Sequence, residues 1–209
     1  REAGGIIFYH RNLVENEKLR NEIVILRLNL FDLREVYLEN TRLKALLGFK
    51  QKSPLRLVPA RVIARTPDSW SSSVIIDKGK NSGIRRGMVV INLRALVGRV
   101  AESEDNSSKV LLVNDPSLGI SSIVQRSRQE GLVSGTLGSN LIMRYLPEDA
   151  DIIVNDLIVT SELSRIYPKG LLVGKVINIA KEFSGLNRYA VVKPAANCST
   201  IEEVLVIIP

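Results

Sequence analysis

Residues 88–113 read MVVINLRALVGRVAESEDNSSKVLLV, and this stretch sets the expectation for most of the chain. It holds three short apolar runs rich in β-branched side chains, at 88–91, 96–100 and 110–113. Polar residues, among them Asn106-Ser107-Ser108, separate the last two runs. Short runs of this kind, bounded by turn-forming residues, are typical of β-strands. The stretch therefore predicts consecutive antiparallel strands.

The same pattern extends from about Leu57 to the C-terminus. Turn signals such as 80–83 (KNSG) and 184–187 (SGLN) again divide the apolar runs. Strands at this spacing without intervening helices are typical of a sandwich or a barrel. The further predicted strands are 74–76, 120–124, 141–146, 157–160, 171–179, 189–192 and 204–208.

A short internal repeat favours two barrels of related design. Val97-Gly98-Arg99-Val100 and Val173-Gly174-Lys175-Val176 are each followed by a polar loop and another apolar run. Glycine at the second position of a strand allows a bend or a close backbone approach. The repeat is short, so chance similarity is the alternative explanation.

Upstream of the strands, residues 10–47 contain neither Gly nor Pro and show a heptad pattern of apolar residues. Alternating spacings of four and three are the a and d pattern of a coiled coil. In a parallel dimer the g and e charges would have opposite signs, with Glu15 facing Arg20 and Glu22 facing Arg27. The predicted dimer interface comprises Asn16, Leu19, Ile23, Leu26, Leu30, Leu33 and Tyr37.

Two other readings of the helix stay open. The apolar stripe could pack on the chain's own domain, although a buried helix would not require the g–e charge match. A second set of apolar residues lies off the seam and could pack on a barrel or form a second contact face. Its members are Val24, Ile25, Leu28, Phe31 and Leu38, and we assign Phe31 as a candidate partner contact.

Together these patterns predict a mainly β fold: a long N-terminal coiled-coil helix followed by two small antiparallel β-barrels. The helix would span 1–48, because Gly48 is suited to end it. A basic connector and the first barrel would span 49–118, and the second barrel 119–209. The last strand, 203–209, could instead return to the first barrel.

Composition excludes several kinds of site. Cys198 is the only cysteine and His10 the only histidine, so an internal disulfide, a thiolate zinc cluster and any site with two imidazoles are excluded. We expect no metal and no cofactor. Part of the net charge of +7 comes from residues 49–68, which contain no acidic residue before Asp68. The scarcity of aromatic rings argues against nucleic acid, and leaves a partner protein, an anionic wall polymer or a solvated neck.

The chain contains no run of ~18 apolar residues, the length a membrane span needs. No signal peptide is visible. Because the sequence begins at Arg1 without a methionine, we expect it to be a fragment whose membrane anchor lies just upstream.

Several further motifs occur in order along the chain: ENTRLKALLGF (39–49), PARVI (59–63) with Trp70, IDKGKNSGI (76–84), LVGRV (96–100), VTS (159–161) and YPKGLLVGKV (167–176). Taken together, they resemble the MreC family of rod shape-determining proteins over about residues 39–209. Two positions depart from the family pattern: Asn155 replaces a usual Gly, and Glu162 replaces another. Asn tolerates a left-handed backbone better than Glu does.

The resemblance implies a membrane-anchored scaffold of the elongation complex that builds the lateral cell wall. It implies a single-pass anchor in the cell membrane, with this region on the extracytoplasmic side. The implied partners are a class B penicillin-binding transpeptidase, MreD and, indirectly, the actin-like MreB. Lys169 lies within the best-marked motif, which makes it a second candidate partner contact.

Two competing functions are weaker. The family's barrels are similar in fold to chymotrypsin-type domains, but His10 is far in sequence from Ser161 and from every other serine of the β region. A Ser161–Lys169 dyad would need a desolvated lysine, whereas Lys169 lies in a Pro-Lys-Gly turn. A periplasmic adaptor of an export pump would need a helical hairpin, and only one long helical segment is visible. We therefore expect no enzyme activity.

Overall fold

The computed structural model describes residues 2–52, 55–66, 72–136, 138–161, 166–181 and 188–208. Side chains are described for Arg20 and from Glu22 onward, Lys52 excepted. Residues 1–48 and 49–209 form two separate compact units, and each is described by itself.

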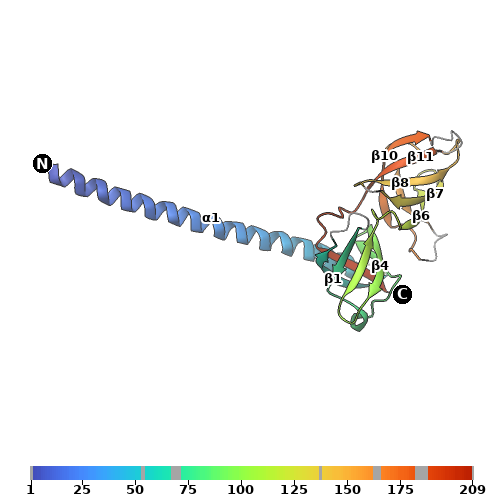
Figure 1. Cartoon of the computed structure of the whole chain (residues 1–209), viewed down its shortest axis with the longest axis horizontal. Helices are drawn as coiled ribbons and strands as arrows, with labels where there is room; N and C mark the ends of the chain where they lie inside the picture. The colour runs from blue at the N-terminus through green and yellow to red at the C-terminus, as the bar shows by residue number, and fades with distance from the viewer. Residues whose placement is uncertain are drawn as a thin grey trace. The chain divides into compact units, whose positions relative to one another are not determined.

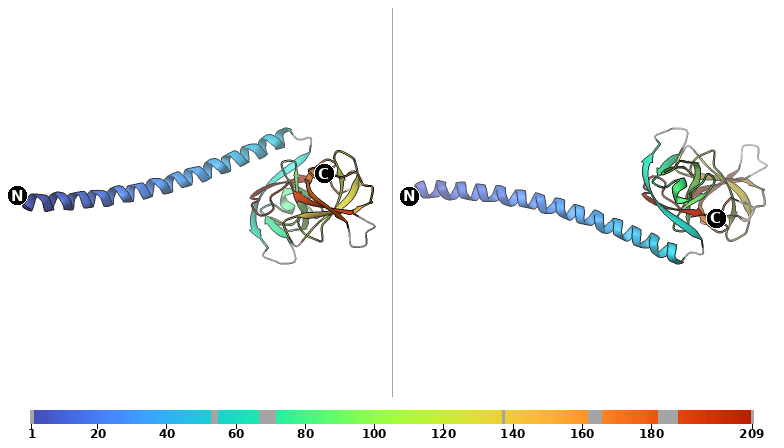
Figure 2. Two further views of the ribbon diagram at one scale, coloured as in Figure 1. Left: turned by 90° about the horizontal axis from the view of Figure 1, so that it is seen from above. Right: turned by 90° about the horizontal axis from the view of Figure 1, so that it is seen from below.

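The first unit is a single helix, α1 (Glu2–Lys52), which is continuous and gently curved (Figures 1 and 2). The prediction that Gly48 ends this helix is wrong, because α1 continues to Lys52 and Gly48 has no positive φ. Glycine costs a helix interior only about 1 kcal/mol relative to alanine. The stronger helix-breaking residue, Pro54, comes later in the sequence. Within the described residues, no helix combines the length and apolarity needed to cross a membrane.

The first barrel consists of six antiparallel strands that close in the order β4-β5-β2-β1-β12-β3 and back to β4. The C-terminal strand β12 lies between β1 and β3, and Figures 1 and 2 show it beside β1. The strands are β1 (Arg56–Arg65), β2 (Ser73–Ile76), β3 (Val89–Asn92), β4 (Ala95–Ser103), β5 (Ser108–Leu112) and β12 (Glu203–Ile208).

The second barrel closes in the order β10-β11-β8-β7-β6-β9 and back to β10, again antiparallel. Its neighbour order equals that of the first barrel once β12 is placed ahead of β1. The prediction of a mainly β chain with two antiparallel barrels after a long helix is confirmed. The strands are β6 (Gly119–Val124), β7 (Glu130–Gly135), β8 (Leu141–Leu146), β9 (Leu157–Thr160), β10 (Leu172–Lys181) and β11 (Arg188–Pro194).

The internal repeat marks equivalent strands of the two barrels, β4 and β10. A Cβ on Gly98 would lie 2.0 Å from the carbonyl oxygen of Leu111 in β5, and one on Gly174 would lie 2.3 Å from that of Lys193 in β11. The predicted close backbone approach is therefore confirmed in both copies. In each strand a register shift follows two residues after the glycine. The two strands also pair with each other, in parallel, at Ala95 and Leu172.

Two features of the β unit differ from the sequence-based expectation. Strand β7 was not predicted, because its sequence EGLVSG has little β propensity. Close packing against neighbouring backbone requires glycine in this strand, since a Cβ on Gly135 would lie 2.1 Å from the backbone of Asn114. The segment predicted as a basic connector is largely β1, a strand of the first barrel. Its Arg65 donates hydrogen bonds to the carbonyls of Cys198 and Ile201, each at 2.6 Å.

Both barrels have buried apolar cores, and in strands such as β5 the buried side chains alternate with more exposed ones. The first barrel buries Val74, Ile76, Val90, Ile91, Leu96, Val110 and Leu205, and the second buries Ile120, Val124, Leu141, Met143, Leu146, Ile158 and Val192.

Candidate functional site

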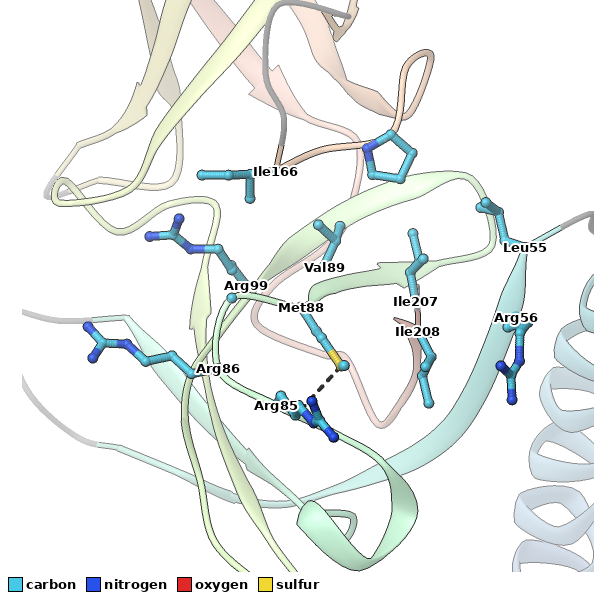
Figure 3. Close-up of a pocket in the computed structure, with 12 residues that line it drawn as sticks. Leu55, Arg56, Arg85, Arg86, Met88, Val89, Arg99, Ile166, Ile207 and Ile208 are labelled. Carbon is cyan, nitrogen blue, oxygen red and sulfur yellow. Dashed lines mark hydrogen bonds between the residues drawn. The ribbon is translucent and has the colours of Figure 1, made fainter.

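The surface of the β unit contains a groove of about 730 Å³, shown in Figure 3. Its lining comes from four segments of the first barrel and from the turn before β10 in the second. Apolar side chains form much of the lining, and four arginines surround them. The apolar residues are Leu55, Met88, Val89, Ile166, Pro168, Ile207 and Ile208, and the arginines are Arg56, Arg85, Arg86 and Arg99.

The loop before β3 is built to expose two of these arginines. Ile84 is completely buried and anchors the loop, while Gly83 and Gly87 take positive φ values of 81° and 92° on either side. The Gly87 amide donates to the carbonyl of Val100 at 2.8 Å, which fixes the loop against β4. Glycine adopts such left-handed conformations without steric cost. Between these fixed points Arg85 and Arg86 are directed into solvent.

The opposite wall is the turn before β10, and buried Thr160 holds it in place. The Thr160 hydroxyl donates to the carbonyl of Pro168 and accepts a hydrogen bond from the amide of Leu171 at 2.9 Å. Gly170 has φ 82°, as the predicted tight turn requires, and its amide donates to the Thr160 carbonyl at 3.1 Å. Tyr167 is buried at 3% exposure, so Ile166 and Pro168 line the groove.

The charge of the groove has one sign. No carboxylate lines it, and none of its four arginines forms a salt bridge within the described part of the chain. Arg126, outside the groove, shows the contrast: it contacts Asp151 at 2.7 Å and Asp156 at 3.0 Å. A depression lined by charges of one sign concentrates the electrostatic potential. The groove is therefore suited to a ligand that combines apolar and anionic groups.

The helix presents the second candidate surface. Of the predicted seam, Ile23, Leu26, Leu30, Leu33 and Tyr37 are all between 47% and 70% exposed within this chain. The side chains of Asn16 and Leu19 lie outside the described residues, as does that of Glu15. The off-seam residues are exposed as well, Phe31 at 63%. An apolar stripe left in water along a long helix is typical of a surface that is covered on assembly.

The two candidate partner contacts belong to different units. Phe31 lies on α1, whereas Lys169 is exposed on the turn that carries Ile166 and Pro168. Lys169 does not line the groove, but it follows the lining residue Pro168 directly. Sequence reasoning thus identified the correct turn while selecting a neighbour of the lining residues.

Three described side chains that could act as nucleophiles are Ser161, Lys169 and Cys198. Ser161 is buried at 4% exposure, and Lys169 is exposed on the turn. Burial raises the pKa of the Cys198 thiol from 9.0 to about 11, so the reactive thiolate is scarce at neutral pH. The side chain of His10 and the turn at Glu162 lie outside the described residues. Asn155 has φ 78°, the left-handed conformation expected where the MreC family usually has glycine.

Sequence patterns missed most of the groove. Arg56 lies in the basic segment 49–68, Arg99 in the internal repeat and Pro168 in the motif 167–176, but the sequence did not indicate that they share a site. The pair Arg85-Arg86 between two glycines was the available signal, because exposed charges in a tight loop often face a ligand. Ile207 and Ile208 read simply as the end of a strand, and their place beside the loop depends on the path of β12.

Comparison with known proteins gives matches along most of the chain. Residues 62–208 match the family model described as rod shape-determining protein MreC, barrel core. The cell shape-determining protein MreC of Geobacillus stearothermophilus is 32% identical over 92% of this chain and 71% of its own length. That of Escherichia coli strain K12 is 29% identical over 93% of this chain and 53% of its own length. The chain thus spans about half of the latter relative.

Solved structures also match this chain. An MreC structure matches with a TM-score of 0.77 at 27% identity, covering 83% of this chain and 99% of that one. A chain from a complex between Penicillin-Binding Protein (PBP2) and MreC from Helicobacter pylori matches with a TM-score of 0.59. It is 18% identical and covers 73% of this chain and 97% of that one, a likeness that concerns the fold alone.

Proposed function

The chain belongs to the MreC family of rod shape-determining proteins, and from this we propose that it is a non-catalytic, membrane-anchored scaffold of the bacterial elongation complex. It would organise lateral peptidoglycan synthesis through protein–protein contacts. The observation that carries the proposal is the apolar groove edged by arginines, which offers contacts to a partner. The arginines are the only ionisable residues in the described part of its lining, and arginine does not exchange protons at physiological pH. The lining is therefore suited to binding rather than to acid–base chemistry.

We place this region on the extracytoplasmic side of the cell membrane, with a transmembrane anchor elsewhere in the full-length protein. Family membership supports this location. The helix α1 would pair in parallel with that of a second copy and set the distance of the barrels from the membrane. The exposed stripe of apolar side chains on α1 supports the pairing.

For the partner of the groove we propose the class B penicillin-binding transpeptidase. The support is the MreC of Helicobacter pylori, which forms a complex with PBP2. MreD and, indirectly, MreB would be further members of the same assembly. Ile166 is the residue to test, because it lines the groove and is 48% exposed, so a polar replacement need not disturb folding.

The test measures binding of the transpeptidase's extracytoplasmic region to the full chain by surface plasmon resonance. Ile166→Asp should abolish binding by placing a polar group in the apolar lining. Ile177→Asp is the matched control, since Ile177 lies on β10 outside the groove with a similar exposure of 43%. Failure of the wild-type chain to bind would overturn the proposed partner. Unchanged binding by Ile166→Asp would remove the groove from the interface.

A further inference from the structure

We propose that the groove recognises an extended segment of a partner protein in which acidic side chains flank apolar ones. This inference rests on the proposed function in taking the groove as a partner site. Its basis is the unbalanced charge of Arg56, Arg85, Arg86 and Arg99 around an apolar lining.

The closed barrels determine how such a segment would bind. Every strand of the β unit is hydrogen-bonded to at least two neighbours, so the described strands leave no open sheet edge for an added strand. Recognition must therefore use side chains. The volume of about 730 Å³ is within the usual range for pockets and accommodates a few apolar side chains of a partner.

The arginines indicate that the segment carries acidic side chains beside its apolar ones. Guanidinium groups are weakly hydrated and bind carboxylates through two parallel hydrogen bonds, so they suit an acidic partner better than lysines would. The loop anchored by Ile84 holds two of them at the groove edge without a competing carboxylate. Among the described residues that line the groove none has an aromatic ring, which disfavours stacking of a nucleic-acid base or a sugar ring. An acidic, apolar peptide segment matches both features.

The experiment uses the full chain and a fluorescein-labelled peptide that alternates leucine with aspartate or glutamate. Fluorescence anisotropy should show saturable binding that weakens steeply at about 1 M salt, where the Debye length is about 3 Å. A peptide with lysine in place of the acids should bind at least about tenfold more weakly, and so should one with serine in place of leucine. Equal binding of the acidic and lysine peptides would overturn the proposal.

Protein variants locate the binding site. The double variant Arg85→Glu, Arg86→Glu should weaken peptide binding about tenfold, because two attractive contacts become repulsive. Arg144→Glu is the control, since Arg144 is exposed on β8 and does not line the groove. Circular dichroism of each variant establishes that it is folded. Undiminished binding by the folded double variant would contradict the assignment.

Other occupants would give different results. Phosphatidylglycerol vesicles that bind through Arg85 and Arg86, without peptide binding, would overturn the proposal in favour of an anionic surface. Loss of self-association in the double variant, seen by light scattering without peptide binding, would assign the groove to a second copy. If the transpeptidase binds the double variant as well as wild type and the peptide does not bind, the inference fails while the proposed function stands. If the peptide binds and the transpeptidase does not, the inference stands and the proposed transpeptidase partner fails.

Discussion

At the scale of single residues, the turn before β10 separates side chains that hold the fold from side chains that face outward. Thr160 and Tyr167 are buried, and four hydrogen bonds that involve Thr160 fix the path of the chain between Pro168 and Leu171. Lys169 lies within the same turn and is exposed. Neighbouring residues of one motif therefore have distinct roles, which substitution can separate.

Tyr167→Ala should lower the free energy of unfolding by about 3 to 5 kcal/mol, the usual cost of truncating a buried aromatic residue. Lys169→Glu should change it by less than about 1 kcal/mol, as is usual for an exposed charge. Urea unfolding followed by circular dichroism measures both values. A small loss for Tyr167→Ala would mean that its ring contributes little to packing. A large loss for Lys169→Glu would mean that its charge has a structural role.

Arg126 supports a second local structure, the turn that holds Asn155 in its left-handed conformation. Its guanidinium donates to both oxygens of Asp156, and the Ile153 amide donates to the same carboxylate at 3.0 Å. The hydrogen bond from Arg126 is the main reason that the pKa of Asp156 is below its ordinary value of 3.8. A carboxylate whose pKa is lowered by folding stabilises the fold at pH values above its ordinary pKa. This stability is lost as the pH falls through the folded-state pKa.

Arg126→Leu should therefore destabilise the protein at neutral pH, and the difference from wild type should shrink as the pH falls below about 3.8. Urea unfolding at a series of pH values measures this difference. Arg144→Leu removes an exposed arginine that has no salt bridge among the described residues, and its effect should not vary with pH. A difference for Arg126→Leu that is constant with pH would contradict the linkage to Asp156.

At the scale of elements, the glycines of β4 and β10 allow each strand to approach its neighbour closely. Gly98→Ala and Gly174→Ala should each cost more than about 3 kcal/mol, the upper end of ordinary overpacking, because the added carbon meets backbone. Gly48→Ala is the control, since nothing lies within 4 Å of its added carbon and alanine favours a helix. Thermal unfolding compares the three. Normal stability in Gly98→Ala would show that β5 can move away.

The helix seam makes a separate prediction about α1. The wild-type chain should form a dimer with twice the mass of the 23.2 kDa chain by light scattering. Leu26→Lys with Leu33→Lys should give monomers by placing charges at two d positions. Val24→Lys with Leu28→Lys, off the seam, should leave the dimer intact. A monomeric wild type, or equal dissociation of both variants, would show that the seam is wrongly assigned.

At the scale of the whole molecule, the two barrels differ in how the chain completes them. The second uses six consecutive strands, β6 to β11, whereas the first needs β12 from the far end of the sequence. β12 pairs with β1 over Arg56–Arg61 and with β3 at Val90 and Ile91. The first barrel can therefore close only after the chain has passed through the second.

Deleting residues 203–209 should open the first barrel, because β1 and β3 both lose a neighbour and the interior loses Val204, Leu205 and Val206. A fragment of residues 117–196 should still fold, since it contains every strand of the second barrel. Hydrogen exchange measured by mass spectrometry should show protection restricted to β6–β11 in the truncated chain. Retained protection of β2 and β5 would contradict this dependence on β12.

Local sequence patterns were sufficient to predict the fold class. Apolar periodicity distinguishes the helix from the strands, and most strands follow from short β-branched runs, because these signals depend on neighbours within a few residues. The glycine repeat identified β4 and β10 before any pairing was known. The same local reasoning failed at β7 and at Gly48. In β7 a partner backbone selects glycine against its propensity, and at Gly48 a modest helix penalty is outweighed by the favourable residues around it.

The long helix, the β character of the remainder, the two-barrel design and the exposed turn at Lys169 thus follow from the sequence alone. Which strands close each barrel, and which side chains line the groove, follow only from the folded structure. The physical reason is distance along the chain: Arg56, Arg86, Ile166 and Ile207 come together only when β12 returns to the first barrel and β10 pairs with β4. Local propensity carries no information about such contacts, because they depend on the packing of remote segments into closed barrels.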